Sequence, residues 1–226
     1  MNPLLLVFDV DGTLIDSQAQ IVSSMTAAFL SVELEPPARA RILSVVGLSL
    51  SDAMSRLLPE ASPQIVQHLV EGYRTAYLAD REAGRAEQQM PLFEGAQEAL
   101  EDLAERGEVL LGVATGKARR GLQFLVDQHG WGDLFHTFQS ADGHPSKPHP
   151  AMLVSAMDAC AMTPSATVMI GDTTFDVDMA VAAGASAIGV SWGYHSPAAL
   201  QQSGAEVVLD RFGDLIPYLE SSGRLI

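Results

Sequence analysis

The sequence has little cysteine and no long apolar run. Its one cysteine, Cys160, excludes an internal disulfide and fits a reducing compartment. Because Cys160 lies in the apolar run 157–162, we expect a core residue rather than a nucleophile. No apolar run reaches the roughly 18 residues of a membrane span, and no basic segment precedes the first one. We therefore expect neither a signal peptide nor a transmembrane helix, and a cytoplasmic protein.

Positive charge is also scarce. Lysine and arginine total 13 against 28 acidic residues, and the formal net charge is -15. Nucleic acids and anionic membrane surfaces repel such a chain, so we expect neither as a partner. An anionic substrate would have to be attracted locally, by a metal ion, a lysine or helix amino-termini.

The 226 residues suffice for one large domain, or for one domain with an insertion. The chain is organised around segment 4–13, LLLVFDVDGT. Its apolar run predicts a buried strand that ends at Asp9 and Asp11, and Gly12 allows a sharp turn. Two carboxylates on one face of a strand need a cation or a shared proton. An ordinary acidic turn after a strand is the alternative.

Between residues 17 and 87 the sequence predicts only helices. Apolar residues recur at helical spacing over 21–29, 40–46, 51–58 and 65–78. We expect Gly47 to end the second of these helices, with a close backbone approach as the alternative. A helical block between two α/β stretches predicts an inserted small domain at 16–90, whereas 1–15 and 91–226 form the α/β core.

From Phe93 onward, apolar strands alternate with helices. This order predicts parallel strands with right-handed crossovers, and hence a Rossmann-like α/β sheet. The predicted strands cover residues 109–115, 135–140, 166–171, 187–190 and 207–209, and the predicted helices 96–106, 117–129, 150–161, 175–183, 197–203 and 212–220.

Polar residues follow the first four predicted strands, and parallel strands bring such positions to one sheet edge. In chain order these residues are Asp9 and Asp11, then Thr115, then Lys147, then Asp172, Thr173 and Asp176. Each alone is more commonly a cap or a surface charge. Together they suit phosphoryl transfer, with a carboxylate nucleophile, a second carboxylate as acid and base, and a lysine and a hydroxyl on the phosphate oxygens. A magnesium ion would offset the repulsion between nucleophile and phosphate.

The segments DVDGT (9–13) and GDTTFD (171–176), with Thr115 and Lys147 between them, resemble the four motifs of the haloacid dehalogenase superfamily. The likeness covers essentially the whole chain. Within the superfamily the chain is similar to the phosphoglycolate phosphatase-like branch, whose helical cap is inserted just after the first strand. The resemblance implies a Rossmann-like parallel sheet with an all-helical cap, and a Mg²⁺-dependent phosphatase that forms an aspartyl phosphate.

The resemblance also implies roles for the catalytic residues. Asp9 would be the nucleophile and a magnesium ligand. Asp11 would be the general acid and base, and would give its backbone carbonyl to the metal. Thr115 would bind phosphate, Lys147 would bind phosphate and pair with Asp9, and Asp172 would be the second carboxylate on magnesium.

Other residues would support these groups. The backbone amides of Val10 and Gly116 would reach the phosphate. Asp176 and Thr173 would surround the metal ligands, with Asp176 orienting Lys147 or metal-bound water. For Asp176 an ordinary acid in the first turn of a helix remains the alternative.

Substrate specificity is expected to come from the cap and its hinge. Gly47 and Ser49 are predicted to face the active site and bind substrate, and the further candidates are Asp16, Gln20, Arg39, Arg41 and Leu48. The two arginines would read a substrate carboxylate, with a plain surface position as the alternative. The partner expected is a small phosphorylated metabolite, and monomer and homodimer both stay open.

Two other functions have the same kinds of residue. A phosphomutase of the superfamily, similar to β-phosphoglucomutase, would return the phosphoryl group to a sugar. A receiver-type signalling domain also has a phosphorylated aspartate, but that aspartate follows an interior strand. Such domains also lack a helical insertion of this length.

Overall fold

The computed structural model describes residues 3–85 and 90–225. Six parallel strands form one sheet in the order β3-β2-β1-β4-β5-β6, which is a doubly wound order. The strands are β1 (Leu4–Phe8), β2 (Val109–Thr115), β3 (Thr137–Ser140), β4 (Thr167–Gly171), β5 (Ser186–Val190) and β6 (Val207–Leu209). The Rossmann-like α/β sheet predicted from the sequence is confirmed.

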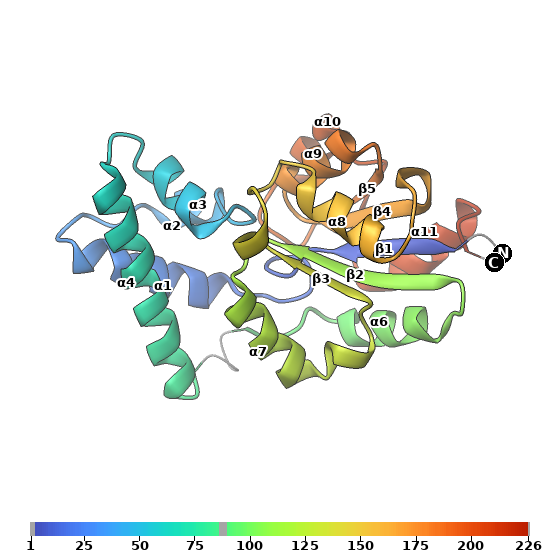
Figure 1. Ribbon diagram of the computed structural model, residues 1–226, viewed down its shortest axis with the longest axis horizontal. Helices are drawn as coiled ribbons and strands as arrows, with labels where there is room; N and C mark the ends of the chain where they lie inside the picture. Colours follow the sequence, from blue (N-terminus) through green and yellow to red (C-terminus); the bar gives the residue numbers. More distant parts are fainter. Residues whose placement is uncertain (1–2, 86–89, 226) are drawn as a thin grey trace.

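Helices cover both faces of the sheet (Figure 1). One face packs against α6 (Ala96–Glu105), α7 (Arg119–His129) and α11 (Leu215–Ser221), and the other against α8 (Ala151–Ala159), α9 (Thr174–Ala183) and α10 (Pro197–Ser203). The central strand serves both layers because its side chains alternate: Leu6 and Phe8 enter the first core, and Leu5 and Val7 the second. Short 3-10 turns lie at η1 (Trp131–Asp133), η2 (Ala141–Gly143), η3 (Pro164–Ala166) and η4 (Phe212–Asp214).

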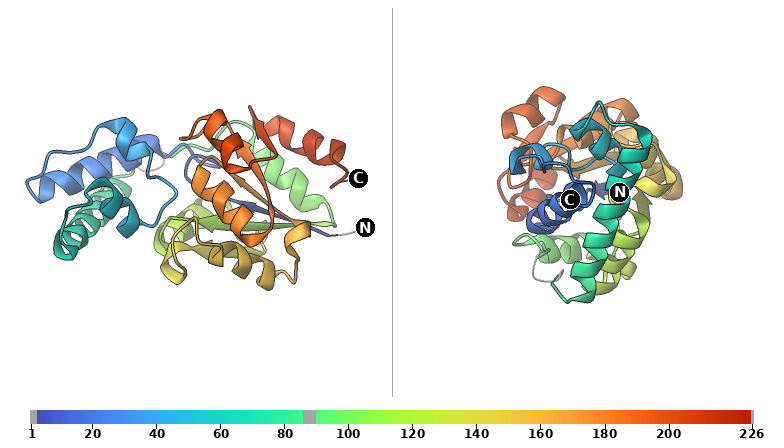
Figure 2. Two further views of the ribbon diagram at one scale, coloured as in Figure 1. Left: turned by 90° about the horizontal axis from the view of Figure 1, so that it is seen from above. Right: turned by 90° about the vertical axis from the view of Figure 1, so that its left-hand side faces the viewer.

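Four helices between β1 and α6 form a separate group, which we call the helical block. They are α1 (Gln18–Ser31), α2 (Arg39–Leu43), α3 (Leu50–Leu57) and α4 (Pro63–Glu82), and they enclose a hydrophobic core of their own. Helices α1 and α4 pack closely at Gly72, where a Cβ atom would lie 2.6 Å from the Ser31 hydroxyl. The block lies at one end of the molecule, beyond the carboxyl edge of the sheet, and both described chain ends lie at the other (Figures 1 and 2).

Two connections join the helical block to the α/β part, and they run side by side. The amide of Asp16 donates to the carbonyl of Pro91 (2.8 Å), and that of Phe93 donates to the carbonyl of Leu14 (3.0 Å). The two connections lie near residues 15 and 91. Residues 86–89 of the predicted insertion lie outside the described residues.

The structure corrects three details of the sequence prediction. Helix α2 ends at Leu43 rather than at 46, because tight turns begin at residue 44 and lead to Gly47, whose φ is +98°. Helix α7 begins at Arg119, so Lys117 lies in the loop after β2. Strand β3 begins at Thr137, because the preceding residues form the end of the η1 turn.

Two other expectations can be compared with the structure. Cys160 is half-buried against the second core layer, and burial raises the pKa of its thiol. Across the described residues, no helix has both the length and the apolar character that a membrane crossing requires.

Candidate active site

The site lies at the point where the chain direction across the sheet reverses. From β1 the chain passes to β2 on one side and later returns to β4 on the other, so Asp9 and Asp172 follow neighbouring strands. The amide of Asp9 donates to the carbonyl of Ile170 (3.0 Å), which holds the two strand ends together. Loops diverge at such a reversal and leave a crevice, which is where open α/β sheets bind ligands.

Lys147 reaches this point from the loop after β3 and is completely buried. Its Nζ lies 3.0 Å from Oδ1 of Asp9 and 2.5 Å from Oδ1 of Asp176. Burial alone would lower the pKa of the ammonium group, but the two carboxylates outweigh it and raise that pKa. Lys147 is therefore a fixed positive charge beside Asp9.

Asp176 has two roles at once, because its two oxygens have different partners. Oδ2 accepts from the backbone N–H of Thr173 (3.0 Å) and from the Thr173 hydroxyl (2.7 Å), which caps the start of α9. Oδ1 accepts from Lys147. The two interpretations of Asp176, a helix-start acid and an orienting group for Lys147, thus describe the same carboxylate.

Asp172 is held by the loops after β1 and β5. Its Oδ1 accepts from the Thr13 hydroxyl and its Oδ2 from the backbone N–H of Tyr194, each at 2.9 Å. Glycine is required beside it, since a Cβ atom on Gly193 would overlap the Cβ of Asp172. Burial first, and then the charges of Asp176 and Asp9, raise the pKa of this carboxyl group.

The acidic groups exceed the positive charge that faces them. Asp9, Asp172 and Asp176 each place an oxygen within 4.8 Å of the others, and Lys147 is the cation that pairs with two of them. In the described part of the chain, Oδ2 of Asp9 is buried and has no hydrogen-bond partner. The pKa of Asp9 is raised to about 7, mainly by burial, with Lys147 opposing and the charges of Asp176 and Asp11 adding to the rise.

These features fit a divalent cation. The donors are carboxylate oxygens, which hard cations such as Mg²⁺ prefer. Such a cation would bind the buried Oδ2 of Asp9 and would favour the ionised form of this carboxyl group.

Asp11 pairs with a lysine that was not selected from the sequence. Nζ of Lys117 lies 3.0 Å from Oδ1 of Asp11, with both side chains largely buried, and 5.4 Å from the centre of the Tyr77 ring. Burial would lower the pKa of Lys117, and the negative charge of Asp11 outweighs it and raises that pKa. Lys117 is two residues beyond Thr115 and just past a strand end, and this position was the signal available in the sequence.

The loop after β2 is in contact with the helical block. The hydroxyl of Thr115 is buried and accepts from the backbone N–H of Lys117 (3.2 Å). At Gly116 a Cβ atom would lie 2.5 Å from the carbonyl oxygens of both Gly47 and Leu48. Only a glycine at position 116 allows this approach of the helical block to the β2 edge.

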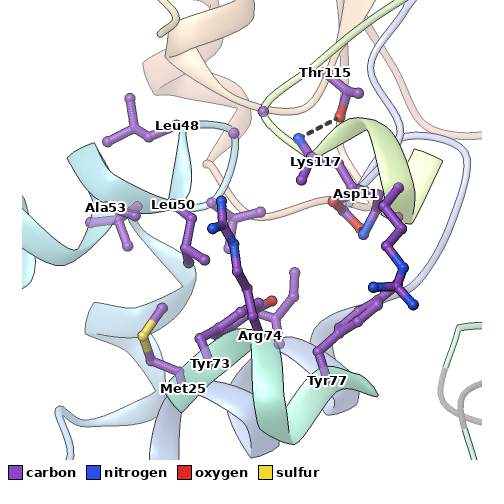
Figure 3. A pocket seen from close by; sticks show the side chains of 18 of the residues that line it. Asp11, Met25, Leu48, Leu50, Ala53, Tyr73, Arg74, Tyr77, Thr115 and Lys117 are labelled. Atoms are coloured by element: carbon purple, nitrogen blue, oxygen red, sulfur yellow. Dashed lines mark hydrogen bonds and ion pairs between the residues drawn. The ribbon is translucent and has the colours of Figure 1, made fainter. Parts of the chain in front are cut away.

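A cavity of about 450 Å³ lies between the helical block and the carboxyl edge of the sheet. Asp9, Asp11, Thr115, Gly116 and Lys117 line one side of it. Figure 3 shows Asp11, Thr115 and Lys117 on that side, opposite Met25, Leu50 and Ala53 of the helical block. A small molecule in this cavity would touch the carboxylates on one side and the helical block on the other.

The specificity candidates from the sequence fall into two groups. Gly47 and Leu48 line the cavity. Ser49 lies between lining residues but does not itself line the cavity, and its amide donates to the Ser146 hydroxyl (2.7 Å) in the loop after β3. Gly47 is not a helix end, because it lies four residues past α2. A Cβ atom at position 47 would lie 3.1 Å from the Thr173 hydroxyl, so the close-approach alternative describes this glycine correctly.

The other four candidates have internal partners and do not line the cavity. Asp16 accepts from the backbone N–H of Gln18, Gln20 is buried and donates to Ser24 and Asp80, Arg39 donates to Gln18, and Arg41 donates to the carbonyl of Leu57. The arginines that line the cavity are Arg74, Arg81 and Arg120 instead. Val10 buries its side chain in the first core layer, so only its backbone is available to a ligand.

The doubly wound sheet and the buried carboxylates at its reversal point define an α/β protein with an enzyme-like site. The model of the haloacid dehalogenase-like hydrolases matches residues 6–190. The chain is 35% identical over 224 residues to the "Probable phosphatase IndB" of Dickeya dadantii, a match that covers 96% of this chain and 93% of that one. It therefore belongs to the haloacid dehalogenase-like hydrolase family.

Further relatives agree with this membership. A phosphoglycolate phosphatase of Pectobacterium atrosepticum is 30% identical over 222 residues, covering 96% of this chain and 92% of that one. Among solved structures, a hydrolase from Pseudomonas syringae superposes with a TM-score of 0.84 at 23% identity, covering 96% of this chain and 98% of that one. A haloacid dehalogenase-like family protein from Streptococcus pneumoniae superposes with a TM-score of 0.82 at 22% identity, with the same coverage of both chains. The two structures support the fold alone.

Proposed function

We propose that this protein is a Mg²⁺-dependent phosphatase that hydrolyses a small phosphate monoester through an aspartyl phosphate on Asp9. The observation that carries the proposal is the setting of Asp9. It lies on the cavity wall with one oxygen paired to Lys147 and the other buried without a hydrogen-bond partner among the described residues. A carboxylate held in this way is oriented for attack. The phosphatase names of the relatives point to the same reaction.

In the first step Oδ2 of Asp9 attacks the phosphorus atom and the ester oxygen leaves. Asp11, two residues further along and on the same cavity, gives the leaving oxygen a proton. Its other oxygen accepts a hydrogen bond from the Lys117 ammonium group, which fixes the orientation of the carboxyl group, and the contact becomes an ion pair once the proton has left. The hydroxyl of Thr115 and the amides of Val10 and Gly116 bind the phosphoryl oxygens, and Lys147 supplies the positive charge beside them.

In the second step Asp11 takes a proton from water, and that water attacks the phosphorus of the aspartyl phosphate. Inorganic phosphate and free Asp9 result. Asp9, Asp172 and the backbone carbonyl of Asp11 would hold Mg²⁺, which would supply positive charge that offsets the repulsion between carboxylate and phosphate. Asp176 and Thr173 keep Lys147 in place during both steps.

The helical block serves as a cap in this proposal, so residues 16–90 form the cap and residues 1–15 with 91–226 form the catalytic core. Its Gly47 and Ser49 lie where a cap loop would border the substrate, against Thr173 and Ser146 of the core. The partner is a small phosphorylated metabolite. The single cysteine and the acidic surface charge are in keeping with work in the cytoplasm.

The test is an assay of phosphate release from a panel of small phosphate esters, with Mg²⁺ or with a chelator. Turnover that needs Mg²⁺, is lost in Asp9→Asn and is retained in Asp127→Asn supports the proposal. The control aspartate is exposed on α7. Turnover that survives Asp9→Asn would overturn the assignment of the nucleophile. Phosphoryl transfer to a sugar phosphate, with no free phosphate, would indicate a phosphomutase instead.

A further inference from the structure

The cavity above the carboxylates is much larger than a phosphoryl group and a two-carbon acid require. At about 30 Å³ per water molecule, its 450 Å³ corresponds to roughly 15 waters. The groups with roles in the proposed chemistry line only the side toward the sheet. The rest of the cavity is a space that the chemical steps do not use.

The chemical character of that space is uniform. All nine lining residues between positions 21 and 53 are apolar side chains or glycine. They come from three helices and from the turns after α2, and those that belong to the helices are Ile21, Met25, Ile42, Leu50 and Ala53. We call these nine residues the apolar wall. Figure 3 shows three of them, Met25, Leu50 and Ala53, on the same side of the cavity, with Tyr73 nearby.

The charged lining residues are placed elsewhere. The carboxylates Asp9, Asp11 and Asp142 all come from the α/β part, as do the cations Lys117 and Arg120. Within the helical block the charged lining residues are Arg74 and Arg81, both on α4, and the Arg81 guanidinium lies 4.0 Å over the Phe124 ring. The nine apolar or glycine residues themselves carry no side-chain donor or acceptor that could replace the water lost by a polar leaving group.

Resting on the proposed phosphatase function, we infer that the substrate is a phosphate monoester with a mainly apolar alcohol part, in the size range of a hexyl chain or a phenyl ring. The phosphoryl group lies against Asp9, and the apolar part covers the wall. Water beside such a wall has few hydrogen-bond partners, so its displacement by an apolar group favours binding.

The first test is a series of linear alkyl phosphates from ethyl to hexyl, whose leaving groups have similar chemistry and differ in apolar surface. We expect kcat/KM to rise about fourfold per added methylene group. Propyl phosphate should be a better substrate than phosphoglycolate, its carboxylate counterpart of similar size. A flat series, or a preference for phosphoglycolate, would overturn the inference and leave the phosphatase function standing.

Two variants connect the effect to the wall. Leu50→Gln keeps the size of a partly buried wall residue and adds an amide, and it should lower the hexyl-to-ethyl ratio of kcat/KM about fivefold. Leu30→Gln makes the same change on the outer side of α1, at a residue that is 60% exposed, and should leave the ratio unchanged. Equal ratios in the two variants would contradict the role of the wall.

Binding separates this inference from the proposed function. Alkyl phosphonates cannot be hydrolysed, and calorimetry should show affinity and a negative heat-capacity change that both grow from methyl to hexyl phosphonate. This trend without turnover of any ester would support the apolar binding preference and refute the phosphatase function. Binding that does not depend on chain length, together with turnover, would refute the apolar binding preference and support the phosphatase function.

Discussion

The pKa of Asp9 leads to a prediction about stability that requires no substrate. In the folded protein without metal this pKa is about 7, against an ordinary value of 3.8, so the folded state holds a proton that the unfolded state releases. The free energy of unfolding therefore falls as the pH rises from about 4 to 7. The variant Asp9→Asn has a neutral side chain of nearly the same shape and lacks this dependence.

The size of the effect follows from the two pKa values. Ionisation of Asp9 lowers the free energy of unfolding by about 1.7 kcal/mol at pH 5 and by about 4 kcal/mol at pH 7, relative to a side chain that stays neutral. The stability of Asp9→Asn minus that of the wild type should thus grow by roughly 2 kcal/mol between these pH values. Saturating Mg²⁺ should remove this growth, because the cation favours the ionised carboxylate.

Urea unfolding of both proteins in chelator, at pH 5, 6 and 7, measures the difference directly. The other titrating groups are common to both proteins. The charge of Asp9 raises the pKa of Asp172, so any change at Asp172 in the variant has the same sign as the predicted difference. Added Mg²⁺ at 100 times its dissociation constant should stabilise the wild type by about 2.7 kcal/mol and the variant by much less. A stability difference that stays constant with pH would show that burial does not raise the pKa of Asp9, and would refute the reasoning.

Three further substitutions test other contacts. Lys147→Met leaves two buried carboxylates without their cation and should destabilise the metal-free protein by about 3 kcal/mol in urea unfolding. An unchanged unfolding midpoint would contradict the pairing of Lys147 with Asp9 and Asp176. Gly116→Ala places a Cβ atom 2.5 Å from two carbonyl oxygens of the helical block, and should lower kcat/KM about 100-fold with little change in Tm. Unaltered kinetics would show that this contact does not matter for catalysis. Lys117→Met releases Asp11 and should lower kcat about 10-fold or more for alkyl phosphates. The loss should be much smaller for p-nitrophenyl phosphate, whose leaving group needs no proton, and equal losses for both substrates would argue that Lys117 does not position Asp11.

Much of the fold could be predicted from the sequence because its signals are local. The run 4–8 is apolar on every residue and lies at the centre of the sheet, so its identification as a buried strand did not depend on the rest of the chain. Asp9 and Asp172 each follow a strand, and the carboxyl ends of parallel strands lie at one edge of the sheet, so the two carboxylates could be predicted to lie at the same edge. The predicted end of α2, at residue 46, lies beyond the observed end because Val45 and Val46 continue the apolar pattern of the helix. These two residues lie in buried turns instead.

The substrate side of the site could not be predicted in the same way. Arg39 and Arg41 are predicted to read a substrate carboxylate, but their partners are groups within the helical block. Local sequence does not reveal such pairings. Tyr73 and Arg74 line the cavity because α4 lies against the loop after β2 and against α7, where Tyr77 contacts Lys117 and Arg81 contacts Phe124. That orientation is a property of the whole arrangement, so no pattern within α4 indicates it.

The central claim is that Asp9 carries the phosphoryl group during turnover, and the most direct measurement is a burst experiment with Asp11→Asn. With p-nitrophenyl phosphate and Mg²⁺, the first step proceeds without a general acid, whereas the second lacks its base. We predict a rapid release of one p-nitrophenolate per active site, followed by slow turnover, with the phosphoryl group found by mass spectrometry on the peptide that contains Asp9. A burst that persists in the double variant with Asp9→Asn, or one that leaves no phosphoryl group on the protein, would contradict the account.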